Sequence, residues 1–164
     1  MTPPTPAPFS VVLVCTGNTC RSALGEALLR QALVARGAAG VEVSSAGTGA
    51  WEGAPASEAA YLVGLEQGLD LSPHRARLLT PDLAASAGLL LTMARHHRSR
   101  VLELAPGARV QLLGEFAGRR TADAEIADPY GADLEVYRQT RDDLASMMDT
   151  VAARILDERL DDRR

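Results

Sequence analysis

Residues 9–22 read FSVVLVCTGNTCRS and join two different local patterns. The first part, from Phe9 to Val14, is a short apolar and β-branched run, which is typical of a buried strand. Beyond the loop, apolar residues recur at helical spacing up to Gly37, and Ser22 is placed to cap that helix. We therefore expect a strand, a tight loop and a helix in direct succession.

The loop carries a cysteine, Cys15, and six positions later an arginine, Arg21. In so short a loop the backbone N–H groups can point inward and form a nest for an anion, to which the helix adds its positive end. Gly17 and Asn18 tolerate the positive φ that a tight loop needs. Arg21 offers a fork that matches two phosphate oxygens, and Ser22 can hydrogen-bond the thiolate of Cys15. The spacing predicts transfer of a phosphoryl group to sulfur.

Strands and helices alternate through the rest of the chain. Further strands are predicted at residues 41–45, 88–93 and 109–113. Helices are predicted at 57–68, from Thr80 onward, at 95–104 and at about 133–160, with loops at 46–55 and 119–132. This alternation predicts an α/β three-layer sandwich, in which helices cover both faces of a four-stranded parallel sheet. Ligands bind beyond the carboxyl ends of such strands, which is where the Cys15 loop lies.

Length and composition fit one domain over residues 9–164, preceded by a proline-rich tail, residues 1–8, that we expect to be disordered. The chain has 164 residues, 46% of them hydrophobic and 23% charged, with a net charge of −4. Its 17 basic residues are all scattered arginines, so we expect no nucleic-acid partner. No segment has transmembrane length, and two cysteines five positions apart suggest neither a disulfide framework nor a zinc site. We expect a cytoplasmic monomer.

The predicted phosphoryl transfer needs an acid that protonates the leaving group, and Asp128 is the best candidate. It stands in the polar loop 119–132, where Pro129 stiffens the backbone and Tyr130 can form an apolar wall. An Asp-Pro pair is also an ordinary turn signal. Together with the Cys15 loop, however, we interpret Asp128 as catalytic.

These two motifs together resemble the low-molecular-weight protein phosphatase family. Further matches follow in the family's order over roughly residues 9–160: Ser45-Ala46-Gly47-Thr48, Trp51, and His74-Arg75-Ala76-Arg77 before Leu79-Thr80. The resemblance implies a phosphorylated protein as substrate and a phosphocysteine intermediate on Cys15. It implies Arg21 and the loop amides as phosphate ligands and Asp128 as acid and then base, with no metal or other cofactor.

The resemblance also implies roles for the residues around the nucleophile. The phosphate-binding loop comprises Thr16, Gly17, Asn18, Thr19, Cys20, Arg21 and Ser22. The residues that support it through hydrogen bonds are Asn18, Ser22, Ser45 and His74. The substrate pocket is lined by Thr19, Trp51 and Tyr130. Cys20 is either a small filler beside the loop or a redox partner that captures oxidised Cys15 as a disulfide.

Within the family, this chain looks like the protein-arginine phosphatase branch. Tyrosine-specific members usually carry a larger aliphatic residue at the position of Thr19 and two adjacent aromatics after the Asp-Pro pair. Here Tyr130 stands alone before Gly131, and residues 137–144 resemble the arginine branch as well. Ionised Asp128 can bind the N–H groups of a guanidinium, which favours phosphoarginine. Phosphotyrosine is the alternative, because a tryptophan wall suits an aromatic ring equally well.

Two other functions deserve less weight. An arsenate reductase shares this fold and loop, but its chemistry resembles one that needs further cysteines downstream, and none follows Cys20. A non-catalytic phosphate-binding module has no need for Asp128. Elsewhere we expect ordinary surface: His96 and His97 as solvated side chains, residues 138–143 as a solvated helix face with salt-bridged pairs, and residues 161–164 as a frayed end.

Overall fold

A four-stranded, fully parallel sheet forms the centre of the computed structural model, which describes residues 7–162. Its strands are β1 (Phe9–Cys15), β2 (Val41–Gly47), β3 (Leu89–Thr92) and β4 (Val110–Leu112), in the spatial order β2-β1-β3-β4. The four predicted strands are confirmed to within two residues at each end. Of the expected tail, residues 1–6 lie outside the described part, and Ala7 and Pro8 have no regular structure.

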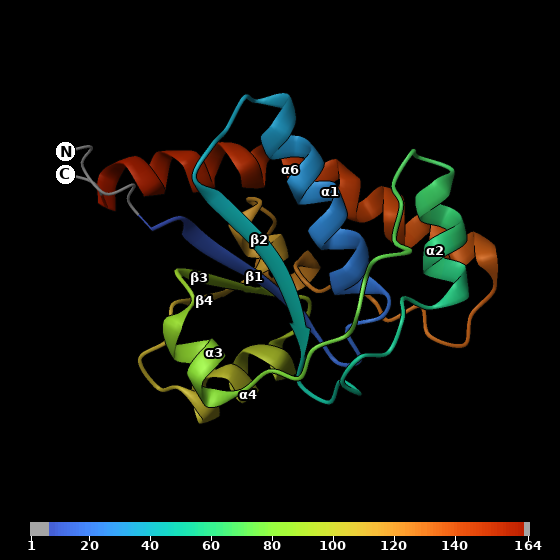
Figure 1. Ribbon diagram of the computed structural model, residues 1–164, viewed down its shortest axis with the longest axis horizontal. Helices are drawn as coiled ribbons and strands as arrows, with labels where there is room; N and C mark the ends of the chain where they lie inside the picture. The colour runs from blue at the N-terminus through green and yellow to red at the C-terminus, as the bar shows by residue number, and fades with distance from the viewer. Residues whose placement is uncertain (1–6, 163–164) are drawn as a thin grey trace.

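Helices cover both faces of this sheet, as Figure 1 shows. On one face lie α1 (Arg21–Ala35), α2 (Glu58–Leu65) and the long α6 (Leu134–Asp162), and on the other lie α3 (Pro81–Ser86) and α4 (Arg95–Leu104). The short α5 (Leu113–Phe116) and the 3-10 turn η1 (Thr121–Asp123) follow β4. The expected α/β three-layer architecture is confirmed. The prediction missed α5 because a four-residue helix has too few turns to show a period.

Strand β1 is buried on both faces, which explains its unbroken apolar run. Val11 and Leu13 belong to the core beneath α1 and α6, whereas Val12 and Val14 belong to the core beneath α3 and α4. All four are at most 1% exposed. The period of two along a strand therefore sends alternate side chains into two separate cores.

The side of the sheet on which successive strands are added reverses at β1. The chain goes from β1 to β2 on one side and then crosses to β3 on the other, so the loops after β1 and β3 start side by side. Gly47, at the end of β2, lets the β1 loop pack closely, because a Cβ atom there would lie 2.3 Å from the Thr16 carbonyl oxygen. Such a switch point is the usual ligand site of an open α/β sheet.

Two helix ends differ from expectation. Helix α1 begins at Arg21, one residue before the predicted cap Ser22, and its N-cap residue Cys20 makes no side-chain capping bond. Ser22 is wrong as a cap because it already lies in the first turn, with its hydroxyl turned toward Cys15. At the other end α6 continues to Asp162, so the expectation of a frayed end is wrong for residues 161–162, which are helical; residues 163–164 lie outside the described part. Ser57 and Thr80 cap α2 and α3 as expected.

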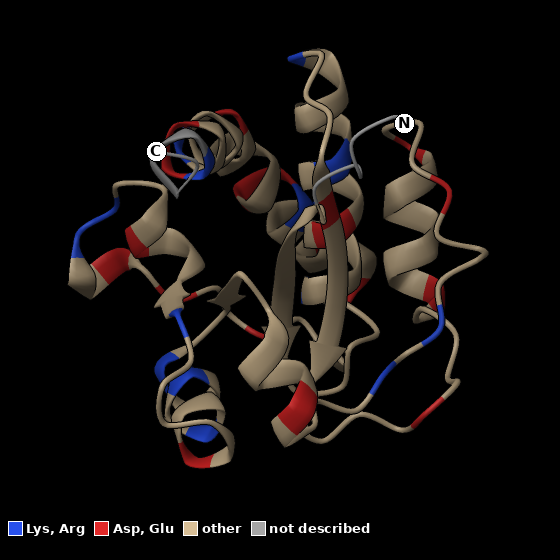
Figure 2. Ribbon diagram, turned by 60° about the vertical axis from the view of Figure 1, so that its left-hand side comes forward, with Lys and Arg blue, Asp and Glu red and all other residues tan. Residues whose placement is uncertain are grey.

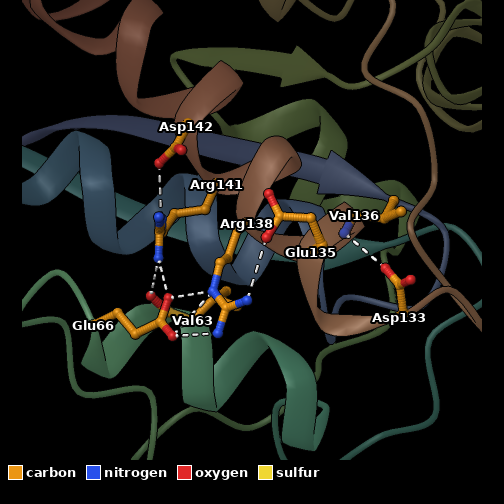
Figure 3. Close-up of polar contacts among 8 residues, drawn as sticks. All are labelled: Val63, Glu66, Asp133, Glu135, Val136, Arg138, Arg141 and Asp142. Atoms are coloured by element: carbon orange, nitrogen blue, oxygen red, sulfur yellow. Dashed lines mark hydrogen bonds and ion pairs between the residues drawn. The ribbon is translucent and has the colours of Figure 1, made fainter.

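A cluster of ion pairs fastens α2 to α6 (Figure 3). Glu66, just beyond α2, accepts hydrogen bonds from Arg138 and Arg141, and Arg138 also pairs with Glu135. The two guanidinium groups, Arg138 first, lower the pKa of Glu66 to about 2. Arg141 is buried and also donates to the Val63 carbonyl oxygen at 3.0 Å. The salt-bridged pairs expected at residues 138–143 are present, and Arg138 keeps 35% of its side chain exposed. The expected solvation is wrong for Arg141, which lies buried against the end of α2.

Charged residues of both signs occur on the helices around the sheet (Figure 2). In α4, for example, Arg100 pairs with Glu103, and Arg98 reaches Glu115 in α5. No helix within residues 7–162 is both long enough and apolar enough to cross a membrane.

Candidate active site

A cavity of about 250 Å³ opens at the carboxyl ends of the strands, where the loop after β1 meets the loop before α6. Its walls come from both predicted motifs: Cys15, Thr16, Gly17, Thr19, Cys20, Arg21, Asp128 and Tyr130. The fold therefore brings together residues more than a hundred positions apart. The three residues predicted to carry the chemistry, Cys15, Arg21 and Asp128, are all among them.

Cys15 is the last residue of β1 and is 2% exposed. Its Sγ atom lies 2.9 Å from Ser22 Oγ and accepts a hydrogen bond from the backbone N–H of Asn18 at 3.3 Å. Asn18 Nδ2 donates to the same Ser22 oxygen at 2.8 Å, so the Ser22 hydroxyl hydrogen is left for the sulfur. The N-terminus of α1 also lies beside Cys15, so hydrogen-bond donors and the positive end of a helix are close to its sulfur.

Asn18 is the centre of the hydrogen-bond network that holds the loop. It is fully buried and has φ 58°, the left-handed conformation expected of it; Gly17, expected to share that role, does not adopt it. The Asn18 amide donates to Ser22 and Ser45 and accepts from the backbone N–H of Arg77 at 2.9 Å. Because a backbone N–H can only donate, this last bond fixes which way the amide faces.

Two further residues complete this network. His74 Nε2 lies 2.6 Å from the Asn18 carbonyl oxygen, and Ser45 donates to Glu26 Oε1 at 2.9 Å. The structure thus places Asn18, Ser22, Ser45 and His74 together around the loop. Sequence reasoning missed Glu26, whose only signal was a carboxylate one helical turn after Ser22 on the side facing β2.

Arg21 links the phosphate-binding loop to the Asp128 loop. It is 4% exposed, its Nη1 donates to the Ile126 carbonyl oxygen at 2.9 Å, and its Nη2 lies 3.6 Å from Asp128 Oδ2. A guanidinium carries five N–H groups, so these contacts leave donors for an anion in the cavity. Arg21 is therefore both the cation of the site and the bridge between its two halves.

The predicted pocket residues have different positions. Thr19 and Tyr130 line the cavity, although Tyr130 is 81% exposed. Trp51 does not line it: its side chain is 85% exposed on the turn that follows β2. The turn holds its backbone by hydrogen bonds, such as Gly53 N–H to the Ala76 carbonyl oxygen, and leaves the indole outside. The prediction that Trp51 forms a wall of this cavity is therefore wrong.

Cys20 lines the cavity on its inner side. Its Sγ atom lies 3.3 Å from Ser57 Oγ and 3.4 Å from the buried Tyr137 hydroxyl, and both cysteines are free. Burial, aided by the bond to Cys20, raises the pKa of Tyr137 to about 12. Tyr137 therefore keeps its proton at neutral pH. The redox role of Cys20 stays a prediction.

His97 was expected in solvent and is instead fully buried. Its Nε2 lies 2.8 Å from Thr16 Oγ1, and its Nδ1 accepts the backbone N–H of Ala94 at 3.1 Å. Burial, then the charges of His96 and Arg21, lower the pKa of His97 to about 4. The prediction failed because two adjacent histidines on a helix face different ways, and the sequence alone does not say which faces the core.

The chain is similar to known phosphatases over most of its length. The family described as low molecular weight phosphotyrosine protein phosphatase matches residues 10–161. A protein-arginine-phosphatase of Geobacillus stearothermophilus is 37% identical over 150 residues, 90% of this chain and 97% of the relative. A low molecular weight protein-tyrosine-phosphatase of Escherichia coli is 38% identical over 130 residues, 78% of this chain and 82% of the relative. A solved arginine phosphatase, a cysteine-to-serine mutant with a phosphorylated active-site serine, is similar with TM-score 0.81 and 31% identity, covering 89% of this chain and 95% of its own.

Proposed function

This chain belongs to the low molecular weight phosphotyrosine protein phosphatase family and is a phosphatase, and on that premise we propose that it hydrolyses phosphoarginine in proteins through a phosphocysteine intermediate. Overall sequence identity does not distinguish phosphoarginine from phosphotyrosine as the substrate, because an arginine phosphatase and a tyrosine phosphatase match this chain at 37% and 38% identity. The choice depends on the cavity.

In the first step the Cys15 thiolate attacks phosphorus. An S–P bond forms, the P–N bond to the guanidine breaks, and Asp128 gives its proton to the leaving nitrogen. Arg21 and the amides of the loop stabilise the charge on the phosphoryl oxygens without a metal ion. The solved relative with a phosphorylated active-site serine in the place of cysteine supports a phosphoryl group at this position.

In the second step water attacks the phosphocysteine. Asp128, now ionised, takes a proton from the water, the S–P bond breaks, and the Cys15 thiolate returns with release of phosphate. The Asp128 side chain is 52% exposed, so water can reach its carboxylate. One carboxyl group then serves as acid and as base in turn.

The arginine preference rests on one observation, which is the set of side chains that can meet the leaving group. Thr19 and Asp128 line the cavity, Tyr130 is its single aromatic, and Trp51 stands outside. A planar guanidinium can donate an N–H to the carbonyl oxygen of the protonated Asp128 carboxyl group, whose O–H is kept for the leaving nitrogen, and can lie against one aromatic ring. A phenyl ring gains more from an apolar wall. Phosphotyrosine remains the second candidate because Tyr130 can stack on a phenol as well.

The test compares two peptides of equal sequence, one with phosphoarginine and one with phosphotyrosine. We expect the wild-type kcat/KM to favour phosphoarginine, and Thr19→Ile to reduce that preference about tenfold, since it replaces a hydroxyl by an apolar branch. Thr19→Ser is the matched control and retains the preference within about twofold. The Cys15→Ser protein measures background hydrolysis. A wild-type preference for phosphotyrosine, or an unchanged ratio in Thr19→Ile, contradicts the proposal.

A further inference from the structure

His97 and Thr16 meet because of the sheet topology. Thr16 directly follows β1, and α4 begins just after β3, the strand that pairs with β1. Val14 in β1 is level with Thr92 in β3, so the two loops leave the sheet side by side. The Asn18 network approaches the loop from β2, whereas His97 approaches it from β3. The phosphate-binding loop is therefore held from both sides.

The hydrogen bonds of His97 fix its tautomer. The Ala94 backbone N–H is a donor and bonds Nδ1, so Nδ1 carries no hydrogen and the neutral ring has its hydrogen on Nε2. That hydrogen is donated to Thr16 Oγ1 at 2.8 Å. The low pKa of His97, about 4, agrees with a ring that stays neutral at physiological pH.

Thr16 is the exposed partner of this bond. Thr16 is one of the residues that line the cavity, next to the nucleophile Cys15. Because its oxygen accepts the hydrogen of His97, its own hydroxyl hydrogen is left for another acceptor. The cavity is the place where an acceptor arrives, in the form of a phosphoryl oxygen.

We propose that His97 is a positioning residue that holds the Thr16 hydroxyl so that its hydrogen is donated to an oxygen of the bound phosphoryl group. Thr16 then adds a side-chain donor to the amides and Arg21, and His97 never touches substrate. The inference rests on the proposed phosphatase chemistry but not on the choice between arginine and tyrosine. It also explains why a polar ring, costly to bury, stands where an apolar one would fill the core.

Two substitutions separate this role from a structural one. Glutamine can keep a donor at the position of Nε2, and asparagine can keep an acceptor at the position of Nδ1. If His97 acts through Thr16, His97→Gln retains the kcat/KM for p-nitrophenyl phosphate within about threefold, and His97→Asn loses about tenfold, the value of one hydrogen bond to a charged group. If His97 only stabilises the start of α4 by accepting the Ala94 N–H, His97→Asn has the higher kcat/KM of the two variants.

The variants His97→Gln and His97→Asn are then made in a protein that also carries Thr16→Val. We expect Thr16→Val to lose about tenfold by itself, Thr16→Ser to stay within about twofold, and the two His97 variants to become equal. Thr16 is exposed, so Thr16→Val and Thr16→Ser report on the hydroxyl even where a His97 variant fails to fold. Equal activity of Thr16→Val and wild type, or a Gln–Asn difference that persists without the hydroxyl, overturns the proposal.

A binding measurement keeps this result separate from the proposed function. The affinity for inorganic phosphate, measured by calorimetry, follows the same order: wild type, His97→Gln and Thr16→Ser bind about tenfold tighter than His97→Asn and Thr16→Val. A wild-type preference for phosphotyrosine, or absence of turnover, contradicts the proposed substrate or reaction and leaves this order intact. Equal affinities across the set contradict the role of His97.

Discussion

The two loops that form the cavity are built differently. In the phosphate-binding loop, Asn18 and Ser22 are fully buried, and the Asn18 side chain is hydrogen-bonded both to Ser45 in β2 and to the backbone of Arg77. In the loop before α6, the Asp128 side chain is 52% exposed and Tyr130 is 81% exposed. Asp128 accepts a local hydrogen bond from the backbone N–H of Tyr130, two residues away. Its long-range contact is the ion pair with Arg21.

This difference matches the two tasks of the site. Donors that stabilise charge act best when they are fixed before the substrate arrives, because no energy is then spent on orienting them. An acid that serves different leaving groups and also admits water needs exposure more than rigidity. The phosphate half is preorganised through burial, and the leaving-group half is open. Three experiments test that contrast.

Removing the acid is expected to have the largest effect. Asp128→Asn cannot donate or accept the proton, so kcat for the phosphoarginine peptide falls by about 10² to 10⁴-fold while the stability changes little. Steady-state kinetics and urea unfolding measure the two quantities. Asp123→Asn, in the same loop and outside the cavity wall, is the control and keeps its activity. A fall of less than about tenfold would remove Asp128 from the acid role.

Removing the centre of the buried network is expected to affect stability instead. Asn18→Ala loses three buried side-chain hydrogen bonds and places an alanine at φ 58°, so the free energy of unfolding falls by about 4 kcal/mol. Tyr130→Ala, in the exposed loop, changes it by less than about 0.5 kcal/mol. Urea unfolding of both proteins is the measurement. Similar losses in the two variants would mean that the loops are equally fixed.

Acid is expected to weaken the β3 side of the phosphate-binding loop. The pKa of His97 in the folded chain, about 4, lies below its ordinary value of 6.5; His96, Arg21, Asp128 and Glu125 are the charged groups that act on it. The unfolded chain therefore takes up the proton first. The stabilisation that comes from the neutral, buried His97 is fully present above pH 6.5. It declines as the pH falls to about 4, which lowers the free energy of unfolding by up to about 3 kcal/mol. The contribution of Glu66 disappears only at lower pH.

Chemical denaturation at pH 7 and pH 4.5 measures this decline. His97→Gln has no group that titrates at that position, so its stability falls less over the same interval. Should wild type and His97→Gln decline in parallel, His97 is not the group responsible.

The parts of the site that could be predicted are those that are contiguous in sequence or lie in a matching motif. Cys15, Asn18 and Arg21 are close neighbours in one loop, so their spacing alone indicates an anion site. Asp128 was identified because the reaction requires an acid on a separate loop and the Asp128-Pro129-Tyr130 run matches the family's motif. The predictions failed where side-chain direction mattered: Trp51 points to solvent, while His97 and Arg141 are buried. A pattern of residue types does not show which neighbour covers a side chain.

The sequence by itself determined the order of strands and helices, the parallel sheet and the phosphate-binding loop after its first strand. These depend on local periodicity and on chemistry within a few residues. The tertiary structure decided which distant groups reach that loop: Arg77 on the β2 side and His97 on the β3 side. The reason is physical, since those contacts depend on how the strands are ordered across the sheet, and no pattern along the chain specifies that order at atomic distance.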